Sequence, residues 1–156
     1  DADVMATVAG DYTAKFWDIR QPRSGLTIEA HHNEIMSCDW NKYNSNWFAT
    51  GCVDKSIKIW DIRNPGRPLR SLFGHKFAVR NLRWSPHNKF QLMSASYDMS
   101  TILWDINIDE PLVERLEHHT EFVLGVGYNQ FIDGLVASCG WDGRVTSWML
   151  GTDPRR

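Results

Sequence analysis

Residues 94–105 read SASYDMSTILWD, and the residue types in this stretch recur along the chain at a fixed period. Together with His75 upstream, the stretch supplies a tetrad of His75, Ser94, Asp98 and Trp104, in which the last three follow the His by 19, 23 and 29 residues. Two further tetrads have the same spacing, and a partial copy opens the chain: His31, Thr50, Asp54 and Trp60; His119, Ser138, Asp142 and Trp148; Thr7, Asp11 and Trp17. A repeat of about 44 residues predicts an array of similar structural units.

Each period contains short apolar runs separated by turn residues, which predicts antiparallel β-structure. In the middle copy we expect strands at 79–84, 91–96, 100–104 and 112–116. Equivalent strands are expected at 35–40 and 123–128, and at 4–8 and 14–17 near the start. The first strand of each copy ends in a large ring, at Trp40, Trp84 or Tyr128. Since no stretch shows helical periodicity, the predicted fold class is all-β.

This period, with its His, its turn Asp and its Trp-Asp pair, resembles the WD repeat, in which each copy is one four-stranded blade of a β-propeller. The resemblance implies that the chain forms about three and a half blades of a seven-bladed WD-repeat β-propeller, as a single partial domain over 1–156. We expect a blade remnant over 1–29, blades over 30–73 and 74–117, and an incomplete last blade over 118–156. No fourth strand is expected after Trp148, because a strand from the N-terminal region usually completes the last blade of a WD propeller.

The Ser or Thr, His and Asp of each tetrad are also the residue types of a hydrolase triad. A catalytic constellation is normally built once, whereas this one occurs three times in equivalent positions. In WD repeats these residues hydrogen-bond within a blade, and buried polar groups of this kind must all be satisfied. We therefore interpret the tetrads as structural and predict that the protein is not an enzyme.

Composition excludes several other classes. The net charge is −2, from 17 basic and 19 acidic residues, so bulk attraction to nucleic acid or to a membrane surface is not expected. No apolar run reaches membrane-spanning length, and the start at Asp1 lacks the basic segment of a signal peptide. Cys38, Cys52 and Cys139 are odd in number and lack a C-x-x-C pair, so we expect free buried thiols in a reducing compartment.

Two His pairs, 31–32 and 118–119, are the sequence features that most resemble metal ligands. His31 and His119 already belong to tetrads, and no Cys lies near either pair in sequence. We therefore predict no metal and no other cofactor.

The segments between the tetrads resemble a family of peroxins, the receptors for the type 2 peroxisomal targeting signal. Residues 37–44, SCDWNKYN, and 117–122, EHHTEF, carry most of this resemblance because blade architecture does not require them. Trp47 and Phe48, which stand where smaller aliphatic residues are more usual, and Met149, which replaces the Asp after Trp148, depart from the usual pattern. The resemblance implies a cytoplasmic import receptor that cycles to the peroxisome. Its partners would be cargo proteins bearing the signal, a co-receptor peroxin and the peroxisomal docking machinery. The signal would bind as an amphipathic helix across one face of the propeller.

In WD propellers the ligand-facing rim includes the residues that open the first strand of each blade and the residue before the turn Asp. In this sequence those positions hold Glu34, Met36, Val53, Ala78, Arg80, Tyr97, Phe122, Leu124 and Trp141. Six of these nine are larger apolar or aromatic residues, so they would form an exposed apolar patch, a feature that marks interaction surfaces. Glu34, and Glu121 next to Phe122, would pair with basic residues of a bound helix. The alternative is that some of these side chains pack against neighbouring blades.

Two other functions are compatible with the sequence. Residues 17–20 and 60–63 both read WDIR, the W-D-x-R pattern of substrate adaptors of cullin-type ubiquitin ligases. An Arg after Trp-Asp is nevertheless common in WD repeats. A generic interaction scaffold in signalling or chromatin is the second alternative, although a histone-tail reader would need an acidic cavity and the expected rim is mostly apolar.

Overall fold

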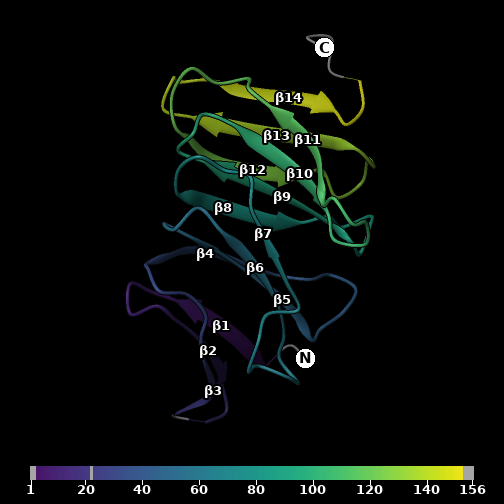
Figure 1. Ribbon diagram of the computed structural model, residues 1–156. Coiled ribbons are helices and arrows are strands. Elements are labelled where there is room, and N and C mark those ends of the chain that lie inside the picture. The colour runs from purple at the N-terminus through teal and green to yellow at the C-terminus, as the bar shows by residue number, and fades with distance from the viewer. Residues whose placement is uncertain (1–2, 22, 153–156) are drawn as a thin grey trace.

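The computed structural model describes residues 3–21 and 23–152. Within these residues every regular element is a β-strand, and the strands form four antiparallel sheets that follow one another along an arc (Figure 1). No described segment is a helix long and apolar enough to cross a membrane. The predicted all-β class and the WD-type arrangement are confirmed.

The first and fourth sheets have three described strands, and the second and third have four. The first sheet contains β1 (Val4–Val8), β2 (Thr13–Asp18) and β3 (Ser24–Glu29). The second contains β4 (Ile35–Trp40), β5 (Trp47–Cys52), β6 (Ile57–Asp61) and β7 (Arg70–Leu72). The third contains β8 (Val79–Trp84), β9 (Gln91–Ser96), β10 (Thr101–Asp105) and β11 (Leu112–Leu116). The fourth contains β12 (Val123–Tyr128), β13 (Leu135–Gly140) and β14 (Val145–Met149).

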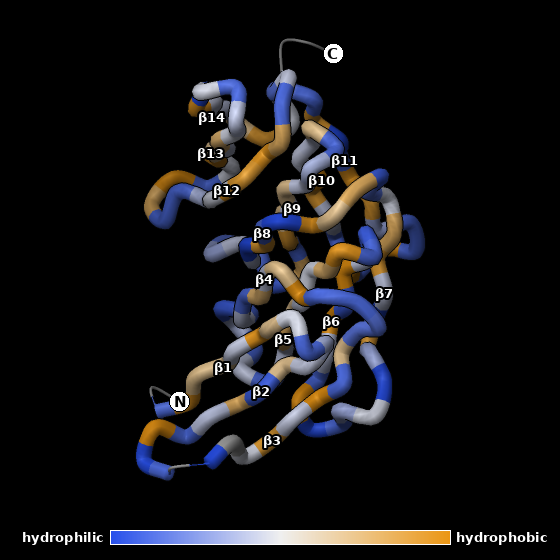
Figure 2. The backbone as a smooth tube through the Cα atoms, turned by 90° about the vertical axis from the view of Figure 1, so that its left-hand side faces the viewer, coloured by the Kyte–Doolittle hydropathy of each residue, from blue (hydrophilic) through white to orange (hydrophobic). Residues whose placement is uncertain are grey.

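The sheets pack face to face, and a hydrophobic core fills each junction between them. Phe16 of the first sheet meets Trp40 and Phe48 of the second, with ring centroids 5.4 and 5.0 Å apart. Trp84 is 1 % exposed in the core between the second and third sheets, as expected for the large ring that ends this strand. In Figure 2, apolar segments run along the strands, and most connecting loops are hydrophilic. Burial between successive sheets therefore holds the arc together.

Gly51 of β5 shows how closely two sheets approach. A Cβ at this position would lie 2.6 Å from Ser37 Oγ and 2.8 Å from Val79 Cγ1. Val79 belongs to the next sheet, so a side chain here would push the second and third sheets apart. The small residue is needed for the close approach of the two sheets.

The four sheets share one turn, which joins the second strand of each repeat to the third. The residue after the turn Asp has a positive φ in every copy: 69° at Tyr12, 73° at Lys55, 67° at Met99 and 73° at Gly143. The Asp carboxylate accepts a hydrogen bond from the backbone N–H two residues later, over 2.9–3.1 Å. This bond holds a left-handed conformation that residues other than glycine adopt at a cost.

Several details differ from the sequence-based expectations. β2 and β10 extend to Asp18 and Asp105, further than the expected 14–17 and 100–104. Cys38 is half-buried and Cys52 is buried, but Cys139 is exposed, so the expectation of a buried thiol is wrong for Cys139. It lies on the face of the fourth sheet that no other described sheet covers. The expected blade boundaries stay predictions. The expectation that no fourth strand follows Trp148 also stays a prediction, because the segment after Trp148 continues past the described residues.

Candidate functional site

The tetrads of the second and third sheets are continuous hydrogen-bonded chains. In the third sheet, Trp104 Nε1 donates to Ser94 Oγ over 2.8 Å, Ser94 Oγ lies 2.6 Å from His75 Nε2, and His75 Nδ1 lies 2.9 Å from Asp98. A carboxylate can only accept, so Nδ1 carries the proton and Nε2 accepts from the hydroxyl. The corresponding distances in the second sheet, through Trp60, Thr50, His31 and Asp54, are 3.0, 2.8 and 3.2 Å.

This order of bonds is also that of a hydrolase triad, but the hydroxyls lie where no substrate can reach them. Thr50 and Ser94 are completely buried, and Ser138 is 3 % exposed. In addition, an indole N–H occupies one lone pair of the Thr50 and Ser94 oxygens. The tetrads therefore tie each turn to its strands.

The turn carboxylates are held in the ionised form. Burial alone would raise the pKa of Asp98, but its hydrogen bonds to His75 and Ser100 outweigh that effect and place the pKa well below the usual range. Arg115, from β11, adds a contact of 3.3 Å to the same carboxylate and also donates to the Gly74 carbonyl. The outer strand thus completes the network of the third sheet.

The fourth sheet lacks one link of the tetrad. His119 lies 2.8 Å from Ser138 and 2.9 Å from Asp142, as in the other copies. Trp148 Nε1, however, is buried without a hydrogen-bond partner among the described residues, and the indole packs edge-on against His118, with ring centroids 4.6 Å apart. In the partial copy of the first sheet, by contrast, the indole bond is present: Trp17 Nε1 donates to Thr7 Oγ1 over 2.8 Å.

One cluster of possible metal donors was not evident from sequence, because folding brings Cys52 to within 4.8 Å of the donor atoms of His31 and Asp54. Cys52 Sγ donates to Asn33 O and accepts from Asp54 N. Ser96 makes the equivalent two bonds in the third sheet, so the thiol fills a turn position. Burial also raises the pKa of Cys52 to about 11, which disfavours the thiolate that a metal would need.

The candidate recognition residues meet in pairs at the end of the sheets that carries the turn Asp. The residue before that Asp donates its N–H to the residue that opens the first strand. These bonds join Val53 to Glu34, Tyr97 to Ala78 and Trp141 to Phe122, over 2.9–3.1 Å. The structure therefore brings the two classes of rim position together in three sheets.

Three of these residues form a continuous aromatic run, Tyr97–Phe122–Trp141. Tyr97 stacks on Phe122 with ring centroids 4.8 Å apart and planes at 28°, and Phe122 contacts Trp141 at 5.3 Å. Tyr97 follows β9 and Phe122 precedes β12, so the run crosses from the third sheet to the fourth. Trp141 is 63 % exposed. The rings pack on one another and still offer a surface to a ligand.

The acidic residues of this end are available for a cation. Glu34 and Glu121 are exposed, and neither forms an ion pair with another described residue. Glu34 lies against the first sheet, since its Cγ is 3.8 Å from the position of a Cβ on Gly10. Four other candidates, Met36, Val53, Arg80 and Leu124, are half-buried, so they offer less surface than expected.

Phe77 is an exposed aromatic residue that was not among the recognition residues predicted from sequence. It is 56 % exposed and precedes Ala78, at the position that Glu121 occupies 44 residues later. This repeat spacing was the signal in the sequence that could have identified Phe77.

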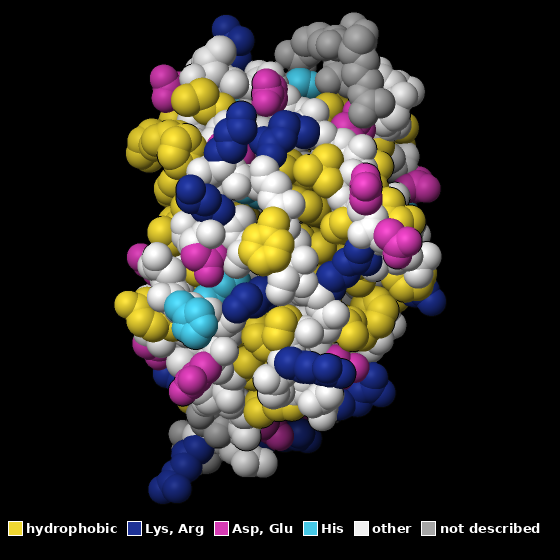
Figure 3. Space-filling view, viewed as in Figure 1, with side chains coloured by type: hydrophobic (Ala, Val, Ile, Leu, Met, Phe, Trp, Pro, Cys, Tyr) yellow, Lys and Arg dark blue, Asp and Glu magenta, His cyan; other side chains and the backbone are white. Residues whose placement is uncertain are grey.

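On the molecular face in Figure 3, hydrophobic, basic and acidic side chains are interspersed, with no extended stretch of a single charge.

The two WDIR segments have a local structural role. Arg20 makes two hydrogen bonds, both of 2.8 Å, to the carboxylate of Asp18, and Arg63 binds Asp61 in the same way over 3.0 and 2.6 Å. The Arg20 guanidinium lowers the pKa of Asp18 to about 2. Each Arg therefore closes the turn that follows its own strand.

Four-stranded antiparallel sheets tied by His–Ser/Thr–Asp–Trp networks define the blade of a WD-type propeller. In agreement, the family model "WD domain, G-beta repeat" matches residues 23–61 and 66–105. A peroxisomal targeting signal 2 receptor from Dictyostelium discoideum is 53 % identical over 220 residues, covering 83 % of this chain and 70 % of that protein.

Receptors of the same name occur in Saccharomyces cerevisiae, 32 % identical with 95 % of this chain and 50 % of the relative covered, and in Mus musculus, 42 % identical with 51 % and 25 % covered. The chain thus spans about half the length of its yeast relative. It belongs to the WD40-repeat family and, within it, to the peroxisomal targeting signal 2 receptors.

Proposed function

We propose that this chain supplies part of the face with which a peroxisomal import receptor holds the type 2 targeting signal of its cargo as an amphipathic helix. The names of the relatives support the role of receptor. The location that we propose for the binding site rests on the aromatic run Tyr97–Phe122–Trp141, because its rings are in contact across two blades at the rim. Trp141 is exposed and Tyr97 and Phe122 are half-buried, so the run presents apolar surface to the solvent, which is a feature of interaction sites.

The dimensions of the run suit a helix. Successive ring centroids are 4.8 and 5.3 Å apart, close to the 5.4 Å pitch of an α-helix. Apolar side chains one turn apart on a bound helix would therefore meet successive rings. Glu34 and Glu121 would accept Arg or Lys side chains from the flanks of that helix.

The aromatic residues should provide most of the affinity. A partly exposed ion pair contributes about 0–1 kcal/mol, whereas truncation of an interface hot spot, often a Trp or Tyr, costs about 2 kcal/mol or more. Trp141→Ala is therefore expected to weaken binding of the signal more than Glu34→Ala. Glu34→Arg should weaken binding most at low salt, because ions screen exposed charges.

The test is the affinity of the complete receptor for a fluorescent type 2 signal peptide at two salt concentrations, with a scrambled peptide as control. Ile108→Ala is the matched control variant, because Ile108 is an exposed apolar residue in a loop at the opposite end of its sheet. Circular dichroism would establish that each variant is folded. If Trp141→Ala and Glu34→Arg both bind like the parent, the signal binds elsewhere.

In this proposal the receptor acts in the cytoplasm and cycles to the peroxisome with a co-receptor peroxin and the docking machinery. It carries cargo without catalysing a reaction, which fits the buried hydroxyls of the tetrads. Blades outside this chain would complete the site, because the chain spans about half of its yeast relative.

A cullin-type ligase adaptor is not favoured. The Arg20 and Arg63 side chains that suggested it are each bound to an Asp of their own turn. Co-purification of the complete protein with a ligase scaffold instead of a peroxin would reverse this preference. A generic scaffold is not supported by any specific feature of the described surface.

A further inference from the structure

Three loops at the end of the sheets opposite the aromatic run have a common construction. They join the first strand to the second in the second, third and fourth sheets, over residues 41–46, 85–90 and 129–134. The first residue of each loop, Asn41, Ser85 or Asn129, accepts hydrogen bonds through its side-chain oxygen from the backbone N–H groups two and three residues later, over 2.8–3.1 Å. The same backbone conformation is therefore presented three times.

The residue two positions after that oxygen carries a ring in every loop: Tyr43, His87 and Phe131. The first two rings each reach the loop of the next sheet. Tyr43 Oη donates to Pro86 O over 2.6 Å, and His87 Nε2 donates to Asn129 O over 2.9 Å. These bonds run in one direction around the arc, from the second sheet to the third and from the third to the fourth.

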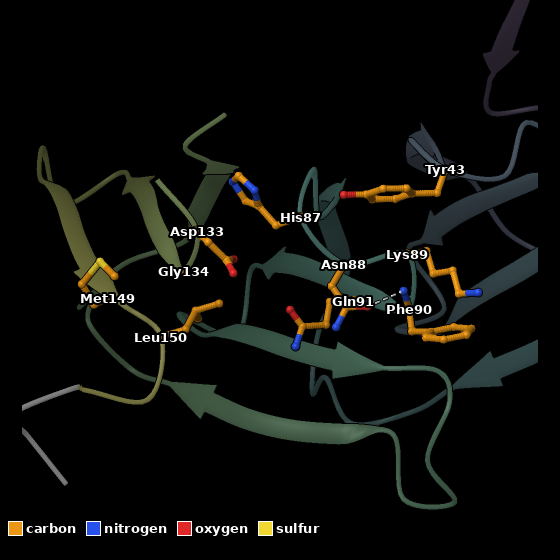
Figure 4. A pocket seen from close by; sticks show the side chains of 10 residues that line it. All are labelled: Tyr43, His87, Asn88, Lys89, Phe90, Gln91, Asp133, Gly134, Met149 and Leu150. Atoms are coloured by element: carbon orange, nitrogen blue, oxygen red, sulfur yellow. Dashed lines mark hydrogen bonds between the residues drawn. The ribbon is translucent and has the colours of Figure 1, made fainter. Parts of the chain in front are cut away.

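Side chains from all three loops also line one groove at this end of the sheets. Tyr43, His87 and Asp133 belong to the walls of a groove of about 590 Å³. Figure 4 shows Tyr43 and His87 on successive loops of this groove, with Asp133 beyond them. The contacts from ring to next loop thus hold neighbouring blades together at this end of the molecule.

Phe131 occupies the third position of this series and is 92 % exposed. Its backbone is fixed in the same way as in the other two loops, because its N–H donates to Asn129 Oδ1 over 2.8 Å. A phenyl ring has no polar atom to offer a carbonyl, and the adjacent Ile132 is also 50 % exposed. The surface that receives this loop should therefore be apolar, unlike the backbone oxygens that receive Tyr43 and His87.

We propose that Phe131 is a closing contact of the complete propeller. It packs in an apolar recess on the first-to-second-strand loop of the blade that follows the fourth sheet around the ring. The polypeptide for such a blade exists in the relatives, since this chain spans about half of the yeast receptor, and the fourth sheet leaves one face open, where Val145 is 78 % exposed. The inference is independent of where the targeting signal binds.

The test places a photo-crosslinking phenylalanine analogue at position 131 of the complete receptor and identifies the linked peptides by mass spectrometry. The expected product is an intramolecular cross-link to the first-to-second-strand loop of the next blade. The matched control is the same analogue at Phe73, an exposed ring at the end of β7 that should not give this product. A cross-link to a second copy, to another protein or to another region would overturn the proposal, as would the absence of any intramolecular cross-link.

A second measurement uses the unmodified receptor, so that it does not depend on the folding of a variant. In hydroxyl-radical footprinting, Phe131 should be oxidised more slowly than Phe73, although the two rings have similarly high exposure in this chain. Equal oxidation rates would show that Phe131 stays in solvent and would refute the closing contact.

Discussion

Replacement of Asp98 by Ala should destabilise the protein without directly removing a binding contact. The Asp98 side chain is 1 % exposed and accepts hydrogen bonds from His75 Nδ1, from the backbone N–H groups of Lys76 and Ser100, and from Ser100 Oγ. Without the carboxylate, the buried His75 N–H loses its acceptor, which costs about 1–3 kcal/mol. Loss of the contact with Arg115 adds to this cost, so we expect a loss of about 3 kcal/mol, towards the lower end of the 3–5 kcal/mol range for a broken buried pair.

The assay is thermal and urea unfolding of the complete receptor, with signal-peptide affinity measured below the transition. A loss of this size should lower the melting temperature by roughly 5–10 °C. Asp11→Ala is the matched control, because Asp11 holds the equivalent turn of the first sheet but is exposed and binds no His; its midpoint should change less. An unchanged midpoint with abolished peptide binding would refute the structural role of Asp98.

Acid unfolding gives an independent test of the same residue. The pKa of Asp98 is held below the value that the carboxyl has in the unfolded chain, so its contribution to stability is fully present above the unfolded pKa, about 3.9. That contribution is lost as the pH falls from there through the folded pKa, because unfolding then takes up a proton. Between about pH 5 and pH 3, the stability of Asp98→Ala should therefore depend less steeply on pH than that of the parent.

Three further changes test other parts of the fold. Gly51→Ala should lower the free energy of unfolding, measured in urea, by about 1–3 kcal/mol, because the new Cβ would meet Ser37 and Val79. Gly66→Ala is the control and should be neutral, because no atom lies within 4 Å of its Cβ position. Equal unfolding midpoints for the two variants would contradict the close packing at Gly51. Cys52, buried with a pKa of about 11, should resist iodoacetamide at pH 8 until the protein unfolds, and rapid labelling of the native protein would show that the site opens. Met99→Gly should raise stability by a few tenths of a kcal/mol to about 1 kcal/mol, because Met99 has a φ of 67°; a lower unfolding midpoint would mean that lost side-chain contacts outweigh the relieved strain.

Much of the fold could be predicted because the repeat allows each assignment to be checked against two others. The bounds of β4, β8, β9 and β12 agree with the expected strands, since each run is framed by the same turn chemistry. The hydrogen bonds of the His75 tetrad follow equally well from its spacing. Local pattern and tertiary structure agree at these positions.

The remaining features depend on contacts between residues far apart in sequence. The stacking of Tyr97 on Phe122 joins two sheets, so the pattern of residues within one repeat does not predict it. The missing indole bond of Trp148 could not be foreseen, because the spacing of its tetrad is the same as in the others. Cys139 aligns with the buried Ala95, yet it is exposed because its sheet has one uncovered face.

The turn shared by all four sheets has an evolutionary consequence. One backbone conformation, with φ between 67° and 73°, is kept with Tyr12, Lys55, Met99 and Gly143 at the same position. The carboxylate one residue earlier enforces that conformation, so side chains of different kinds can follow it, at a modest cost in strain for residues other than glycine. Substitutions can accumulate at these positions around the rim without altering the scaffold. A repeat of this kind can therefore present a different side chain at the rim of each blade on one unchanged backbone.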